Sequence, residues 1–192
     1  MDINKQNRRR GSGMNDKEIR AQIESLHPVS YGWALSCCRF RPEEAEDVLQ
    51  TVYLKILQGK ARYGGRSSFQ SWLFAVIRKT AQDLARRQIL RRLKLAAWEG
   101  WAAARPETPD PAGEAGRGQL QELFQNALAK LPGRQREVLH LVFYQGLSLR
   151  EAGEVLGLSV GSVRKHYERG KQRLRQILEP IISHEYALES SL

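Results

Sequence analysis

Residues 146–174 read "GLSLREAGEVLGLSVGSVRKHYERGKQRL" and predict two helices joined by a tight turn. Ser148 can cap the first helix. Gly157 can end that helix, and Ser159 can cap the second. Ala152 is small where the two helices have to cross closely. A short helix, a turn that contains glycine and a longer helix form the helix-turn-helix arrangement.

The second of these helices is rich in basic residues, which suits a helix that lies against DNA. An arginine at the start of such a helix can bond a guanine edge in bidentate fashion, for ~1–3 kcal/mol of discrimination, and later basic residues would meet phosphates. Tyr167 and Leu174 lie on the packing side and are expected in the core. The candidate DNA-binding residues are Ser162, Arg164, Lys165, His166, Glu168, Arg169, Lys171 and Arg173.

The overall charge also favours a polyanionic partner. The 192 residues carry a formal charge of +10, for which nucleic acid is the first candidate and an acidic membrane surface the second. Residues 52–94 hold eleven Lys and Arg against the single acid Asp83, and residues 131–179 net +4. Residues 21–51 net −3, so two basic blocks are separated by a mildly acidic one. This pattern indicates two contacts on one long ligand.

Cysteine usage and hydropathy exclude several classes of protein. The adjacent Cys37 and Cys38 cannot by themselves form an ordinary tetrahedral site, so no metal and no other cofactor is predicted. No disulfide framework, membrane span or signal peptide is evident, which favours a cytoplasmic protein. No clustered carboxylates, nucleophile with its base or phosphate-binding glycine loop is found, so neither an enzyme nor a small-molecule substrate is predicted.

The rest of the chain also has helical periodicity, and we predict an all-α protein. Residues 43–57 place apolar side chains at three- and four-residue spacing, and residues 58–68 break the pattern with three glycines. Ser67 or Ser68 can cap a helix that continues to about residue 94. The inward residues expected in these and the later helices are Ala45, Val48, Leu49, Val52, Tyr53, Ile56, Phe69, Trp72, Leu73, Val76, Ile77, Ala81, Leu84, Leu120, Leu123, Phe124, Leu128, Leu131, Val138, Leu139, Val142 and Phe143.

Two stretches together resemble one family. Residues 131–175, "LPGRQREVLHLVFYQGLSLREAGEVLGLSVGSVRKHYERGKQRLR", are similar to the fourth region of bacterial sigma factors. The stretch "AEDVLQTVYLKIL…RYGGRSSFQSWLFAVIRKTAQDLARR" is similar to their second region. The order of the two and the short linker that contains proline resemble the extracytoplasmic-function subfamily of sigma factors, which keeps only these two regions.

The resemblance implies a role for each candidate residue. Asp47, Gln50 and Thr51 fall where the family contacts core RNA polymerase, although the family often has Glu at the last position. The loop "RYGGRSSF" matches the loop that holds a flipped base of the minus-ten element, with Tyr63 as a stacking platform. The residues implied in minus-ten binding are Tyr63, Gly64, Gly65, Arg66, Arg78, Lys79, Arg86 and Arg87, and the basic helix described above would read the minus-thirty-five element.

This sequence departs from the family pattern at three places. Lys79 stands where an Asn often contributes to the base pocket, and Lys cannot accept a hydrogen bond, so the preferred base stays open. The stretch "VRKHYERG" changes the reading face of the second region. Residues 26–42 match the usual first helix poorly, and we expect that helix to be shortened or shifted.

The predicted architecture is two small helical domains joined by a flexible linker. We expect a basic arm at 1–18, a region 2-like domain at 19–97, a linker at 98–118, a helix-turn-helix domain at 119–180 and a tail at 181–192. The predicted function is that of a sigma factor, which binds core polymerase and promoter DNA and, by resemblance, an anti-sigma factor. The alternative is a stand-alone helix-turn-helix regulator that does not depend on polymerase.

Overall fold

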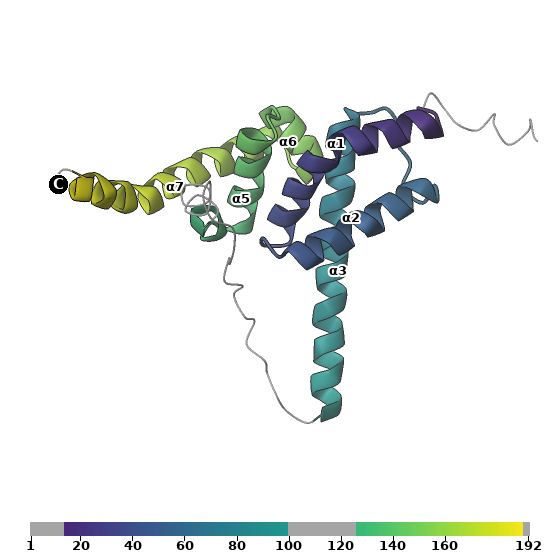
Figure 1. Ribbon diagram of the computed structural model, residues 1–192, viewed down its shortest axis with the longest axis horizontal. Helices are drawn as coiled ribbons and strands as arrows, with labels where there is room; N and C mark the ends of the chain where they lie inside the picture. Colours follow the sequence, from purple (N-terminus) through teal and green to yellow (C-terminus); the bar gives the residue numbers. More distant parts are fainter. Residues whose placement is uncertain (1–13, 100–125, 190–192) are drawn as a thin grey trace, which may run out of the picture. The chain divides into compact units, whose positions relative to one another are not determined.

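The computed structural model describes residues 14–99 and 126–189, and the chain divides into two compact units, Met1–Ala104 and Arg105–Leu192. Every regular element in the described ranges is a helix, so the all-α prediction is confirmed (Figure 1). Each unit has a hydrophobic core of its own.

The first unit begins with α1 (Asp16–Cys37), a helix of 22 residues. The expected shortening of this helix is wrong. The reason is tertiary: Ile23, Trp33 and Ala34 are buried in the unit's core, and this burial outweighs the cost of Pro28 inside the helix. In Figure 1 α1 bends along its length, as helices with an internal proline do.

A tight turn leads from α1 into α2 (Pro42–Leu57). Arg39 and Phe40 both adopt left-handed backbone angles, with φ of 56° and 61°, and the Phe40 amide donates to the Leu35 carbonyl at 2.7 Å. In α2 the predicted apolar stripe is buried, with Ala45, Val48, Leu49, Val52 and Ile56 all inside and Tyr53 half-buried.

The third helix, α3 (Phe69–Glu99), has 31 residues. Ser68 is its cap, because its hydroxyl oxygen accepts a hydrogen bond from the Ser71 amide at 3.1 Å. The core of the unit forms where Trp33 of α1 meets Phe74 of α3. The indole nitrogen of Trp33 donates to the Phe74 carbonyl oxygen at 2.9 Å, so this fully buried ring keeps a partner for its polar atom.

In the second unit, residues 126–129 are helical and are followed by α5 (Gly133–Leu139) and a π-helical turn, η3 (His140–Tyr144). Leu128 and Leu131 are buried, as predicted, whereas the expected core residues 120–124 lie outside the described residues. Leu128 and Leu131 pack in one cluster with Leu139 of α5 and Leu174 of the last helix.

The π-helical turn corrects one prediction. Phe143, expected on the inward face, is 54% exposed, and Val142 is half-buried, while His140 and Leu141 are buried instead. The wider turn, in which the Gln145 amide donates to the His140 carbonyl at 3.2 Å, changes which side chains face inward. The sequence pattern of an ordinary helix cannot reveal this change.

The helix-turn-helix consists of α6 (Leu149–Leu156) and α7 (Val160–Glu189). Ser148 caps α6 in a reciprocal capping box with Glu151, whose pKa is lowered by these hydrogen bonds. Gly157, at a φ of 65°, ends α6, and the Ser159 hydroxyl oxygen accepts from the Ser162 amide at 3.2 Å at the start of α7.

Two glycines set how closely these helices approach. A Cβ atom on Gly153 would lie 2.8 Å from the Leu158 carbonyl oxygen, so the turn packs directly on α6. A Cβ on Gly170 of α7 would lie 3.1 Å from Cδ1 of Leu139 on α5. Ala152, which the sequence marks as the small residue at the crossing, is indeed fully buried.

Helix ends fall inside three of the expected boundary segments. α1 starts at Asp16, within the expected arm 1–18, because Asn15 and Glu18 form a capping box there. α3 runs to Glu99, past the expected start of the linker, and residues 100–125 lie outside the described residues. α7 continues to Glu189, within the expected tail.

Candidate nucleic-acid interface

The outer face of α7 carries most of the residues predicted to bind DNA. Val163, Gly170 and Leu174 turn inward and Tyr167 is half-buried, which fixes the orientation of the helix. Ser162 and His166 are half-buried and lie at the edge of the packed side. The other six predicted residues are exposed, namely Arg164, Lys165, Glu168, Arg169, Lys171 and Arg173.

Three of the eight predicted residues already have partners in α7 or at its cap. The Lys171 ammonium lies 3.5 Å from the Glu168 carboxylate and 4.9 Å from the centre of the Tyr167 ring. The Ser162 hydroxyl is 2.9 Å from that of Ser159 and belongs to the helix cap. Lys165 and Arg169 are one turn apart on the most outward part of the helix, so they are the best placed for a groove.

The loop between α2 and α3 holds a cluster of three aromatic rings. Tyr63 is half-buried and packs against Phe69 and Trp72, with ring centres 5.3 and 5.4 Å away. Its hydroxyl donates to the Ser67 carbonyl at 2.5 Å, which ties the loop closed. Phe69 is buried, as predicted, and Trp72 is half-buried. Tyr63 is therefore one edge of a packed cluster and not an isolated platform.

The remaining loop residues face solvent. Gly64, Gly65 and Arg66 are exposed, and Gly65 has a φ of 71°, which only glycine adopts readily. Gly64 has open space around it. A nucleic-acid backbone could approach this side of the loop closely.

The four basic residues predicted on α3 do not form one row. Lys79 and Arg86 are exposed and lie two turns apart on one face, since seven residues make nearly two helical turns. Arg78 is half-buried and points to a neighbouring face, and Arg87 is exposed on another. The structure therefore places Lys79 and Arg86 on one face of α3, and it places Arg78 and Arg87 on other faces.

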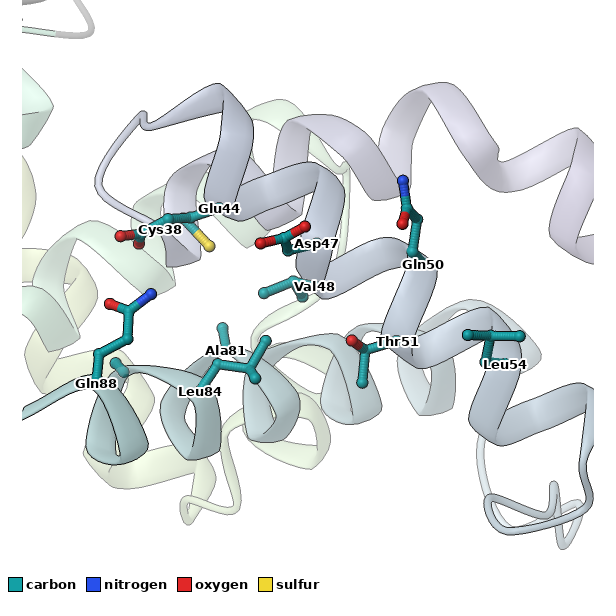
Figure 2. A pocket seen from close by; sticks show the side chains of 11 residues that line it. Cys38, Glu44, Asp47, Val48, Gln50, Thr51, Leu54, Ala81, Leu84 and Gln88 are labelled. Carbon is teal, nitrogen blue, oxygen red and sulfur yellow. The ribbon is translucent and has the colours of Figure 1, made fainter. Parts of the chain in front are cut away.

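The residues predicted to contact polymerase line one pocket between α2 and α3. Figure 2 shows Asp47, Val48 and Thr51 of α2 across from Ala81 and Leu84 of α3. The pocket measures about 210 Å³, below the roughly 300–1,000 Å³ typical of small-molecule sites, and its lining is part polar and part apolar. It is suited to receive a single side chain of a protein partner. Its remaining lining residues are Cys38, Glu44, Gln50, Leu54, Ala85 and Gln88.

Sequence reasoning missed two exposed leucines on the polar face of α2, the first of which lines this pocket. Leu54 and Leu57 are 56% and 53% exposed, although their neighbours Val52 and Ile56 are buried. Both follow Gln50 at helical spacing, on the polar face of α2. Two apolar side chains that interrupt a polar face were the signal available in the sequence.

In the described part of the chain, no group of three or more potential metal ligands occurs. Burial, and secondarily the nearby Glu44, raises the pKa of Cys38 to about 12, so this thiol stays protonated. None of the helices in residues 14–99 and 126–189 is both long and apolar enough to cross a bilayer.

Comparison with known families matches both units. Residues 22–90 match "Sigma-70 region 2" and residues 127–176 match "Sigma-70, region 4". The chain is 31% identical to the RNA polymerase sigma factor CarQ of Myxococcus xanthus, over 70% of this chain and 74% of that protein. It is 31% identical to the ECF RNA polymerase sigma factor ShbA of Streptomyces griseus, over 82% of this chain and 85% of that one.

A third relative is longer than this chain. The ECF RNA polymerase sigma factor SigE of Mycolicibacterium smegmatis is 30% identical over 85% of this chain, which spans 61% of that protein. Among solved structures, the sigma factor RpoE bound to the anti-sigma factor NepR from Bartonella quintana has a TM-score of 0.63 at 22% identity, covering 85% of this chain and 98% of that one. CnrH in complex with the cytosolic domain of CnrY has a TM-score of 0.58 at 23% identity, covering 86% of this chain and 90% of that one. These two structures share the fold.

The two matched regions, in this order, define a two-domain sigma-70-type factor. More narrowly, the chain belongs to the extracytoplasmic-function RNA polymerase sigma factors. The function predicted from the sequence is confirmed at this level, and the comparisons favour it over the stand-alone regulator.

Proposed function

We propose that this chain directs RNA polymerase to a specific set of promoters by reading one promoter element with each of its two units. The observation that carries the proposal is the pairing, in one chain, of a helix-turn-helix with an exposed basic helix and a loop with a packed aromatic cluster. A rigid basic helix suits the major groove of a duplex. An aromatic cluster beside an open glycine backbone suits an unpaired strand.

The helix-turn-helix unit would bind the upstream, minus-thirty-five element. Lys165, Arg169 and Arg164 are exposed near the start of α7, where a recognition helix meets base edges. Arg173 is further along and would meet a phosphate, as would Lys171 once it leaves Glu168. Ser162 and His166, being half-buried, would contribute at the edge of the contact.

The first unit would capture the melted minus-ten strand. The exposed backbone at Gly64 and Gly65 lets the strand approach, and the edge of the Tyr63 ring would take a stacked base. Arg66 in the loop and Lys79 and Arg86 on one face of α3 are exposed and would attract the phosphates. Arg78 and Arg87 lie on the neighbouring faces of α3. The base preference that an Asn gives at this position is not carried over to this chain, since Lys79 cannot accept a hydrogen bond.

Polymerase would bind the outer face of α2. Asp47 and Gln50 are exposed there and, with Thr51, line the pocket between α2 and α3, while Leu54 and Leu57 add apolar area to the same face.

The polymerase would perform the chemistry, so we infer no catalytic activity and no cofactor for this chain. Action on polymerase implies a cytoplasmic location. The solved relatives RpoE and CnrH are bound to NepR and CnrY, and we propose a protein of the anti-sigma class as a partner here too.

The first test is run-off transcription with purified core polymerase on a pooled promoter library, with and without the protein. We expect discrete start sites that appear only when the protein is added, and their alignment would give both elements. Duplex binding without any polymerase-dependent start would contradict the proposal and favour the stand-alone regulator.

Two variants then separate the units. Lys165→Ala should weaken use of the upstream element, while Tyr63→Ala should reduce open complexes by about tenfold and leave upstream binding unchanged. Tyr63→Phe keeps the ring and loses the bond to Ser67, so it tells stacking from loop closure. Lys130→Ala, an exposed change outside both surfaces, is the control. Equal effects of all variants on both steps would contradict the division of roles.

A further inference from the structure

Three exposed apolar side chains lie together on the far half of α3. Ile89, Leu90 and Leu93 are 59%, 51% and 61% exposed. Their spacing of one and three residues puts them on one side of the helix, where they form the distal α3 stripe. Scattered exposed apolar residues are ordinary, but a contiguous group on one helix face marks an interaction surface.

The distal α3 stripe does not continue the buried face of the helix. Ile77 and Ala81 are buried and Leu84 is half-buried, and this row continues as the polar Gln88 and Arg91. At about 100° per residue, the stripe lies roughly half a turn away from that row. The apolar side of α3 thus changes from the inward face to the outward face along the helix, so the unit's own core cannot cover the stripe.

The stripe also lies where α3 extends beyond its neighbours. α3 has 31 residues and α2 has 16, so α3 is longer by some 20 Å at 1.5 Å per residue. Figure 1 shows the far half of α3 extending past α1 and α2 within the first unit. The match to sigma-70 region 2 ends at residue 90, within the stripe, so the family's shared region does not account for all of it.

The charges around the stripe specify its occupant. Arg87 and Arg92 are exposed on the faces beside it, and residues 84–93 contain no acid. Arg86 lies in line with the stripe, three residues before Ile89. A second copy of this helix would bring like charges together, and a bilayer would have to receive Arg86 on the inserted face. Acidic side chains beside an apolar seam complement all of these features.

We propose that the distal α3 stripe is the docking site for one amphipathic helix of a protein partner, with acidic residues flanking its apolar seam. The site goes beyond the promoter and polymerase contacts proposed above and does not depend on them. Because Arg86 and Lys79 share a face of α3, a helix docked on the stripe would also cover part of the surface proposed for minus-ten DNA.

The direct test uses a labelled synthetic helix with Leu at the a and d positions and Glu at e and g, studied by fluorescence anisotropy with the full-length protein. We expect saturable binding that weakens at least ~tenfold in the double variant Leu90→Gln/Leu93→Gln. Gln preserves helix propensity, and circular dichroism would verify that α3 remains folded. Arg87→Gln/Arg92→Gln should weaken binding and reduce its salt dependence.

The control variant is Val29→Gln, an exposed apolar change on α1, which should bind the peptide like the unaltered protein. A version of the peptide with Lys at e and g should not bind. Three results would overturn the proposal: equal peptide binding by the Leu90→Gln/Leu93→Gln variant, stripe-dependent binding to phosphatidylglycerol vesicles without peptide binding, or stripe-dependent dimerisation. Run-off transcription without peptide tests the proposed function separately, so the two failures are distinguishable.

Discussion

The two long helices α3 and α7 are nearly equal in length, at 31 and 30 residues, and both carry basic residues, but they are held in place by opposite means. α3 is held by large side chains, since Trp33 and Phe74 are fully buried against each other. α7 also buries Val163 and Leu174, but its closest approaches to its neighbours fall at small residues, because Gly153 and Gly170 let backbone and side chains approach where no Cβ fits easily.

This difference suits the two proposed ligands. A recognition helix has to present its side chains from a fixed position in a groove, and close packing at glycines fixes it. The loop before α3 presents the edge of an aromatic cluster, and an aromatic core supports such a cluster from behind. The first unit should therefore suffer most from large-to-small substitutions and the second from small-to-large ones.

The largest effect is expected from Trp33→Ala in the first unit. Loss of a fully buried ring and of its hydrogen bond to Phe74 should lower the free energy of unfolding of this unit by about 3–5 kcal/mol. Hydrogen exchange by mass spectrometry would report on α1 to α3 apart from the second unit. Val29→Ala, at a position 37% exposed, is the control and should change little. If Trp33→Ala and Val29→Ala lowered stability equally, the large buried side chains would not be what holds α3 in place.

The next effect is expected from Gly153→Ala in the second unit. The new Cβ would meet the Leu158 carbonyl, a backbone atom that cannot move aside easily, so we expect a loss of about 3 kcal/mol in thermal or urea unfolding. Gly161→Ala, in the same motif but with open space around it, should be neutral or slightly stabilising. Gly170→Ala meets the flexible Leu139 side chain and should fall between them. A different order among the three would contradict the role assigned to close packing.

A smaller, pH-dependent effect should sharpen the comparison further. Burial, and secondarily the positive charge of Arg136, lowers the pKa of His140 to about 4. His140 therefore binds a proton below about pH 6.5 in the unfolded state but only below about pH 4 in the folded state. The stability that neutral His140 contributes is complete above pH 6.5 and is lost as the pH falls toward 4. We expect the second unit to lose about 2 kcal/mol between pH 7 and pH 5.

The measurement is hydrogen exchange of the second unit across this pH range, corrected for the intrinsic exchange rates. His140→Gln should flatten the dependence even if it lowers stability at pH 7. The first unit serves as the internal control, since it has a core of its own that does not contain His140. An unchanged slope in the variant would assign the pH dependence to other groups.

The helix-turn-helix was predictable from the sequence because its signals are local. Ser148 with Glu151, Gly157 and Ser159 act on backbone groups only a few residues away, so a short window of sequence contains the whole cause. The same holds for Ser68 before α3 and for the apolar stripe of α2. The candidate site residues on α7 followed directly, since the inward residues of a helix fix its outward ones.

The misses have causes that lie far apart in the sequence. α1 continues through Pro28 because Trp33 finds its partner Phe74 forty-one positions away, which no local propensity encodes. The position of Tyr63 against Phe69 and Trp72 depends likewise on how the loop returns to the start of α3.

By itself, the sequence determined that this protein is all-α, basic and built from two helical regions, because periodicity, caps and charge are properties of short segments. The resemblance of two stretches to the sigma factors could also be read from it, because those motifs are continuous in the sequence. Only the tertiary structure decided that η3 places Phe143 outside and His140 inside, that Gly153 and Gly170 set the spacing of α7, and that Ile89, Leu90 and Leu93 face away from the core. Exposure and close approach are properties of pairs of segments, and they exist only once the segments have packed.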